Sequence, residues 1–254
     1  MTDAVERARR DVVIANRILA AEGVLDAFGH VSARHPLDKN LFFMAQSVSP
    51  ELVEIDDIMT FDAQGNPVDD RRHASVERFI HAGVYARRPD VNFVVHGHTD
   101  EVIPFSITDV ALVPVINVAA DITAHIPTWD IADEFGDNTN TLISSMAHGL
   151  SLAQTLADHR VVLMRGHGFT AASSSIVQLV RLCVYLPRNA RIQLEAMRLG
   201  EFRPLKAGEI ARLGEIDPDS PASQRSWRYW ARKCGCESLL ENAGAPGRPA
   251  FSAS

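Results

Sequence analysis

The stretch that decides the fold of this sequence is Val94-Val95-His96-Gly97-His98-Thr99-Asp100. The apolar β-formers that lead into it predict a buried strand over residues 92–96. Because the side chains of a strand alternate with a period of two, His96 and His98 point the same way at its end. Two neutral imidazoles on one edge suit a divalent transition metal, although the motif alone also fits two ordinary strand-end histidines.

A second predicted strand ends in a similar way. Residues 160–164 are strongly apolar and are followed by Arg165-Gly166-His167-Gly168, which places a histidine in a turn flanked by glycine. Two such turns after two buried strands are much less expected by chance than one. Three imidazoles with open coordination positions are typical of a catalytic metal site rather than of a closed structural one.

The composition is that of an ordinary globular protein. With 254 residues, 46% of them hydrophobic, the chain can bury a full core in one domain. The net charge of −7 argues against a surface for nucleic acid, and no stretch approaches the roughly 20 apolar residues of a membrane helix. The N-terminus lacks the apolar core of a secretory signal, and three cysteines do not suggest a disulfide framework. We therefore expect a cytoplasmic location.

Hydrophobic periodicity predicts strands that alternate with helices. The remaining expected strands span residues 24–35, 41–46, 58–62 and 113–118, and a hairpin is expected around the turn at residues 65–67. The expected helices span residues 4–21, 75–88, 99–106, 139–157, 175–199 (with a kink at Pro187), 209–213 and 223–233, followed by a loose tail over residues 241–254. This mixture favours an α/β fold with a mixed sheet covered by helices.

Four motifs follow one another along the chain: Gly29-His30-Val31-Ser32-Ala33-Arg34, Ser75-Val76-Glu77, the run from Arg88-Pro89-Asp90 through His98, and Arg165-Gly166-His167-Gly168. In order and spacing they resemble the class II aldolase/adducin family, and the resemblance covers about residues 5–200. It implies a central mixed, mostly antiparallel sheet sandwiched by helical layers. It also implies a homotetramer with active sites at subunit boundaries.

The same resemblance implies a metal site. In that family three histidines hold a divalent metal, and they correspond to His96, His98 and His167. A glutamate early in the helix before the His-x-His strand works as acid/base or as a displaceable ligand, and Glu77 matches it. We expect one divalent ion, Mn²⁺, Zn²⁺ or Fe²⁺, because three histidines with an acidic neighbour accept several metals.

Two positions depart from the sugar-phosphate aldolases of the family. Those proteins have asparagine where this chain has His30, and a serine pair where it has Ser75 and Val76, which implies that the phosphate pocket is dismantled. His30 instead resembles the branch that decarboxylates hydroxylated aromatic or pyridine carboxylates. That branch includes the 3-hydroxy-2-methylpyridine-4,5-dicarboxylate decarboxylase type.

This chemistry suggests roles for the polar side chains. A metal that chelates the ring hydroxyl and the neighbouring carboxylate acts as a Lewis acid, and a nearby acid protonates the ring carbon before carbon dioxide leaves. We therefore expect Glu77 and His30 to be catalytic, although a strand histidine can also be a hydrogen-bonded core group. Candidates for contact with the substrate are Ser32, Arg34, Ser75, Arg71, Arg72 and Arg165, for several of which a sheet edge or a solvated loop is the alternative interpretation.

The sequence thus predicts a metal-dependent, non-oxidative decarboxylase of a small hydroxyaromatic or hydroxypyridine (di)carboxylate, with no nucleic-acid or membrane partner. We expect a catalytic domain over residues 1–205 and a C-terminal helical extension with a loose tail over residues 206–254. The alternatives are an aldolase that cleaves a non-phosphorylated hydroxy-keto acid and a mononuclear iron oxygenase on the same fold. A non-catalytic adducin-like protein is disfavoured, because all three histidines and the glutamate are present. Trp227, Tyr229 and Trp230 are expected to pack on the body or on a neighbouring subunit.

Overall fold

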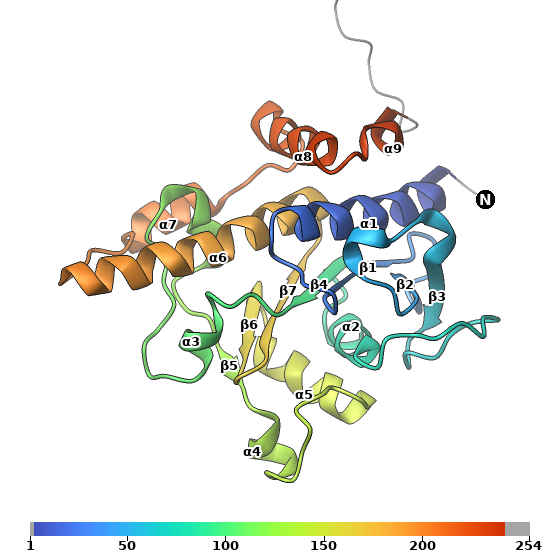
Figure 1. Cartoon of the computed structure of the whole chain (residues 1–254), viewed down its shortest axis with the longest axis horizontal. Coiled ribbons are helices and arrows are strands. Elements are labelled where there is room, and N and C mark those ends of the chain that lie inside the picture. The colour runs from blue at the N-terminus through green and yellow to red at the C-terminus, as the bar shows by residue number, and fades with distance from the viewer. Residues whose placement is uncertain (1–2, 242–254) are drawn as a thin grey trace, which may run out of the picture.

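A seven-stranded sheet forms the centre of the protein, as a computed structural model that describes residues 3–241 shows (Figure 1). The strand order is β3-β2-β1-β4-β7-β6-β5, and every neighbouring pair is antiparallel except β5 with β6. The bounds are β1 His30–Arg34, β2 Leu41–Ala45, β3 Ile58–Asp62, β4 Phe93–Gly97, β5 Thr128–Trp129, β6 Val161–Met164 and β7 Gly168–Ser173. The mixed, mostly antiparallel sheet predicted from the sequence is confirmed.

Helices cover both faces of this sheet, with α1 and α6 on one side and α2 and α5 on the other (Figure 1). Val95 of β4 belongs to the core against α1 and α6, whereas its neighbour Val94 belongs to the core against α2 and α5. This is the period-two alternation of a strand buried on both faces. The helices are α1 Asp3–Ala21, α2 Arg78–Arg87, α3 Ile103–Ser106, α4 Ile131–Phe135, α5 Met146–Leu156, α6 Ile176–Leu199, α7 Ala207–Gly214, α8 Pro221–Lys233 and α9 Glu237–Glu241.

The register of β4 determines which residues meet at the end of the sheet. His96 lies opposite His30 of β1 on one side and opposite Thr170 of β7 on the other. The turn between β6 and β7 passes close to the end of β4, and a Cβ atom at Gly168 would lie 2.2 Å from the carbonyl oxygen of Gly97. Glycine at position 168 therefore permits the approach that brings the two histidine-bearing segments together.

One predicted strand is wrong, because residues 113–118 pair with no strand of the described chain. Two amides of α6 hold this segment instead. Asn189 accepts from Val115 N–H and donates to the carbonyl of Val113, and Gln193 accepts from Val113 N–H. Side chains thus satisfy backbone groups that a sheet would have paired. The segment then enters a 3₁₀ helix, Asn117–Ile122; two further 3₁₀ helices are Pro50–Leu52 and Ile55–Asp57.

Several boundaries also differ from the prediction. The helix expected from residue 139 begins only at Met146, after Ser145 caps it by accepting from His148 N–H, and residues 139–145 form an irregular loop. The helix expected from Ser75 begins at Arg78. The expected hairpin after β3 is a single bridge between Phe61 and Pro67. Four of the helices and strands, α4, α9, β5 and β7, were not expected from the sequence.

The two predicted C-terminal helices are present as α7 and α8. Trp227 and Trp230 of α8 are buried in the core shared with α1 and α6, whereas Tyr229 is 61% exposed. The tail expected over residues 241–254 lies, apart from its first residue, outside the described part of the chain. Within the described residues, no helix has the length and apolar character needed to cross a membrane.

Candidate active site

Four side chains from three separate segments converge at one end of the sheet. His96 is the last residue but one of β4, His98 directly follows that strand, His167 lies in the β6–β7 turn and Glu77 directly precedes α2. The Nε2 atoms of His96 and His98 are 2.9 Å apart, and those of His98 and His167 are 3.2 Å apart. The Glu77 carboxylate oxygens lie 3.4 Å from Nε2 of His96 and 3.5 Å from Nε2 of His167.

The other ring nitrogen of each histidine has a fixed partner. Nδ1–H of His96 donates to the carbonyl of Phe169 (2.9 Å), that of His167 donates to the carbonyl of Thr141 (3.0 Å), and that of His98 donates to Asp26 Oδ1 (3.0 Å). Carbonyl oxygens can only accept, so the proton of His96 and of His167 is assigned to Nδ1. The lone pair on each Nε2 therefore faces the common centre, which is how histidine ligands of metals are usually oriented.

These distances fit one divalent transition metal. Ligand atoms about 2.0–2.1 Å from a shared ion at tetrahedral angles lie roughly 3.3 Å apart. The four separations given above, between 2.9 and 3.5 Å, are close to that value, and one donor atom of each residue lies within 4.8 Å of all the others. The donor set of three imidazoles and a carboxylate is one that zinc, manganese and iron accept.

Glu77 is buried at the N-terminal end of α2. Burial alone would raise the pKa of its carboxyl group, but the neighbouring His167 and His96 outweigh this effect and hold the pKa well below its usual range. The backbone N–H of Ile143 donates to Oε1 at 3.2 Å. Glu77 is therefore an ionised carboxylate, as a metal ligand or a proton acceptor must be.

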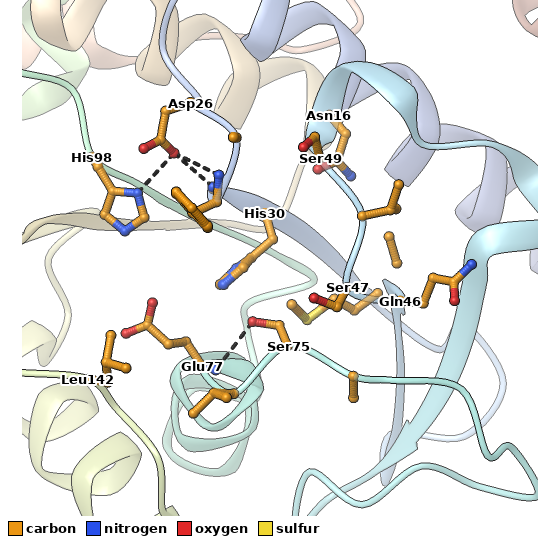
Figure 2. A pocket seen from close by; sticks show the side chains of 18 residues that line it. Asn16, Asp26, His30, Gln46, Ser47, Ser49, Ser75, Glu77, His98 and Leu142 are labelled. Carbon is orange, nitrogen blue, oxygen red and sulfur yellow. Dashed lines mark hydrogen bonds and ion pairs between the residues drawn. The ribbon is translucent and has the colours of Figure 1, made fainter.

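A cavity of about 610 Å³ opens directly beside these groups (Figure 2). Figure 2 shows His98, His30, Glu77 and Ser75 around it, with Ser47 and Gln46 at a greater distance along its wall. This volume suits a small-molecule ligand. Among the described residues its lining contains no lysine or arginine; the residues are Asn16, Asp26, Ala27, Phe28, Gly29, His30, Met44, Ala45, Gln46, Ser47, Val48, Ser49, Ala74, Ser75, Val76, Glu77, His98 and Leu142.

His30 lines this cavity but is itself buried. Its Nδ1 is 2.8 Å from Nε2 of His81, while its own Nε2 has no hydrogen-bond partner among the described residues. Burial lowers the pKa of His30 well below its ordinary value, and the neighbouring His81 and His96 lower it further. His30 is therefore a neutral imidazole at pH 7, and its buried Nε2 is left without a partner among the described residues.

The structure brings only one of the six expected substrate contacts, Ser75, to the cavity. Ser32 is fully buried and contacts His81 and Tyr85 instead. The guanidinium of Arg34 is also buried, where it donates to four backbone carbonyls, including those of Val91 and Tyr85. Neither residue lines the cavity: both lie further along β1 than His30, on the same face of the strand, where α2 covers them.

The three other arginines lie elsewhere on the surface. Arg71 is exposed and does not line the cavity. Arg72 is bound to Asp70 and to the carbonyl of Ile58, and Arg165 pairs with Asp130. Their positions provide no cation for a second substrate carboxylate within this chain.

Two contributors to the site were not anticipated from the sequence. Asp26 holds His98, and it also accepts from the N–H groups of Phe28 and Gly29, each at 3.0 Å. The loop at residues 139–145 supplies the carbonyl for His167 and the N–H for Glu77. An aspartate three residues before a glycine is a turn signal, but nothing in it indicates a partner 72 residues away.

Comparisons with known proteins agree with this geometry. Residues 10–194 match the family model described as Class II Aldolase and Adducin N-terminal domain. The chain is 32% identical over 255 residues to a protein named decarboxylase tropJ from Talaromyces stipitatus, covering 92% of this chain and 96% of that protein. It is 26% identical over 239 residues to a 3,4-dihydroxyphthalate decarboxylase from Arthrobacter keyseri, covering 87% and 92% of the two chains. A solved structure of an aldolase II superfamily protein from Pseudomonas syringae aligns with a TM-score of 0.78 at 19% identity, covering 95% and 97%.

Proposed function

The chain belongs to the class II aldolase and adducin family and is a lyase of the decarboxylase type, and from this premise we propose its reaction. It is a metal-dependent, non-oxidative decarboxylase of a small hydroxyaromatic or hydroxypyridine carboxylate. The observation that carries this proposal is the convergence of three Nε2 atoms and one carboxylate beside an open cavity. The relatives named decarboxylase span nearly the whole chain and support the same reaction class.

In this proposal His96, His98 and His167 would hold a divalent metal, with Mn²⁺, Zn²⁺ and Fe²⁺ as the candidates. An ion held there would supply a Lewis acid for a substrate with a ring hydroxyl next to its carboxylate. The acceptors on the three Nδ1 atoms keep the imidazoles oriented.

Glu77 and His30 are the two proposed catalytic residues. Glu77 is an ionised carboxylate at the edge of the cavity, so it can accept a proton or complete a coordination shell. The His30 side chain lines the same cavity, and its Nε2 has no hydrogen-bond partner among the described residues. Ser75 is the remaining proposed contact with the substrate, and its hydroxyl oxygen also accepts from Glu77 N–H at 3.2 Å.

The side chains that line the cavity indicate what kind of substrate it suits. Neutral hydrogen-bonding groups such as Ser47, Ser49 and Gln46 alternate with apolar ones such as Met44 and Val48. This lining suits a flat, hydroxylated ring whose charged carboxylate is turned toward the metal centre. Among the described residues the lining contains no lysine or arginine, and His30 and Val76 replace the asparagine and a serine that the sugar-phosphate aldolases use, which favours the decarboxylase branch.

The proposal also covers the assembly and the domains of the chain. We assign the catalytic domain to residues 1–205 and treat residues 206–254 as a C-terminal extension. A homotetramer, as the family resemblance implies, is expected in solution, and light scattering tests it.

The direct test is anaerobic incubation of purified, metal-assayed protein with a panel of hydroxyaromatic and hydroxypyridine carboxylates, with carbon dioxide as the readout. The expected result is stoichiometric carbon dioxide and the decarboxylated ring. Release of a keto acid without carbon dioxide would show aldol cleavage instead. Activity that requires and consumes oxygen would show an oxygenase, and either result would overturn the proposal.

A further inference from the structure

A buried chain of hydrogen bonds runs from the cavity into the protein through His30. Nδ1 of His30 is 2.8 Å from Nε2 of His81, Nδ1 of His81 is 2.6 Å from Oγ of Ser32, and that oxygen is 2.7 Å from the Tyr85 hydroxyl. The chain ends at the carbonyl of Asn92, 3.4 Å from the same hydroxyl. All four side chains are buried.

Secondary structure explains how the members of this chain meet. His30 and Ser32 are two residues apart on β1, so they project from the same face of the sheet. His81 and Tyr85 are four residues apart on α2, so they lie on one side of the helix. The two pairs face each other where α2 covers β1, which places all four polar groups in one line.

Arg34, the next residue on the same face of β1, fixes the far end of this line. Its guanidinium carbon lies 4.6 Å from the centre of the Tyr85 ring, and one of its N–H groups donates to the Tyr85 carbonyl. Three further carbonyls hold the guanidinium itself. The phenol therefore has little freedom to move away from Ser32.

Two proton arrangements run in one direction along the whole chain, and the groups at its ends favour one of them; a third, in which Ser32 Oγ accepts from both His81 and Tyr85, makes one hydrogen bond fewer than the first and also leaves the His30 proton on Nδ1. In the first, His30 donates to His81, His81 to Ser32, Ser32 to Tyr85 and Tyr85 to the Asn92 carbonyl, which makes four hydrogen bonds. In the second, every donor is reversed, the carbonyl receives nothing, and Nε2 of His30 becomes a buried N–H with no acceptor among the described residues. A buried N–H without an acceptor costs more free energy than a carbonyl oxygen that accepts no hydrogen bond, so the first arrangement is the stable one.

We propose that His81, Ser32 and Tyr85 are positioning residues that hold His30 in the tautomer protonated on Nδ1, so that its Nε2 lone pair faces the cavity as a proton acceptor. The claim about the tautomer stands on the hydrogen-bond geometry alone. The identity of the group that meets Nε2 rests on the function proposed above, in which it is the hydroxyl of the substrate ring.

The proton transfer at His30 balances without any further reactant. The O–H bond of the ring hydroxyl breaks, an N–H bond forms at Nε2, and the electron pair stays on the ring oxygen. The same proton then moves from Nε2 to the ring carbon that carries the carboxylate. When carbon dioxide leaves, the electron pair of the broken C–C bond returns to the ring oxygen, and an anionic substrate becomes a phenolate and carbon dioxide.

The first test reads the tautomer by NMR of protein with ring-¹⁵N-labelled histidine, because protonated and unprotonated ring nitrogens give well-separated signals. Loss of a signal in His30→Gln identifies the residue. The proposal expects Nδ1 of His30 to carry the proton in the wild-type protein, and a shift toward the other tautomer in Tyr85→Phe. A wild-type His30 protonated on Nε2 would overturn the proposal, whether or not the protein decarboxylates anything.

The second test uses kinetics on a substrate that the carbon dioxide assay identifies. Ser32→Ala and Tyr85→Phe should each lower kcat by about 10- to 100-fold while KM changes little, the size usual for a lost orienting partner. Tyr185→Phe, which removes a phenol hydroxyl from α6 outside the hydrogen-bonded chain, is the matched control and should leave kcat unchanged. Circular dichroism confirms folding, and Ser32→Ala replaces Tyr85→Phe if the latter unfolds. Unchanged kcat in a folded Ser32→Ala or Tyr85→Phe variant would contradict the positioning role.

Discussion

Replacing Asp26 tests how much the surroundings of the candidate metal site contribute to metal binding. Asp26→Ala removes the acceptor for His98 Nδ1–H, whereas Asp26→Asn keeps an oxygen there and loses only the charge. Hydrogen bonds to charged groups contribute about 1.5–3 kcal/mol, against roughly 0.5–1.5 kcal/mol for neutral ones. Because the Asp26 side chain is 48% exposed, solvent screens its charge and the lower end of the first range applies.

The expected effect is therefore about 1.5 kcal/mol for Asp26→Ala, which corresponds to roughly a tenfold weaker metal Kd, with Asp26→Asn close to threefold. Competition with a metal-chelating dye measures both values. Asp62→Ala is a suitable control, because Asp62 accepts from the N–H groups of Gln64 and Asn66 in a similar turn but contacts no histidine. If a folded Asp26→Ala protein bound metal as tightly as the wild type, the reasoning about oriented imidazoles would be refuted.

Two further predictions concern stability. Burial lowers the pKa of His81 from 6.5 to about 3. Between these two pH values the unfolded chain binds a proton that the folded protein does not. The free energy of unfolding should therefore fall as the pH falls through this window, by about 1.4 kcal/mol per pH unit for this one group. Urea unfolding from pH 7 to pH 4 measures the slope, which should be shallower in His81→Gln, and an equal slope would contradict the assignment. Gly168→Ala places a Cβ atom 2.2 Å from the Gly97 carbonyl and should cost about 1–3 kcal/mol, whereas Gly208→Ala, with nothing within 4 Å, should cost little. Equal thermal stability of the two alanine variants would show that the close approach of the two turns is not required.

Much of the fold follows from local patterns that the sequence displays directly. Strand β4 is an apolar run that ends at His96-Gly97, strand β6 is an apolar run followed by Arg165-Gly166-His167, and α1 and α6 have clear helical periodicity. The prediction of a strand over residues 113–118 was wrong because side-chain amides of α6 form the hydrogen bonds with its backbone groups. Hydrophobic periodicity does not reveal such a long-range arrangement. Strand β7 was missed because its sequence, Gly-Phe-Thr-Ala-Ala-Ser, consists mostly of small residues with weak β-propensity; pairing with β4 and β6 nevertheless buries it.

The candidate site divides in the same way. The three histidines were singled out by the glycine-flanked turns that follow two apolar strands, whereas Glu77 was singled out only through the family resemblance; the structure brings the four side chains together. Arg34 was expected at the substrate because arginine binds carboxylates, but burial turned its guanidinium toward backbone carbonyls. Asp26 was missed because its importance comes only from the tertiary contact with His98.

The measurement that bears most directly on the central claim is the metal content per chain of the wild-type protein and of His167→Ala, determined by elemental analysis after gel filtration. The exposed imidazole removed in His125→Ala serves as the control. We expect one divalent ion per chain in the wild type and in the control, and a large loss of metal in a folded His167→Ala protein. Full metal content in His167→Ala would contradict it, because the β6–β7 turn would then supply no ligand.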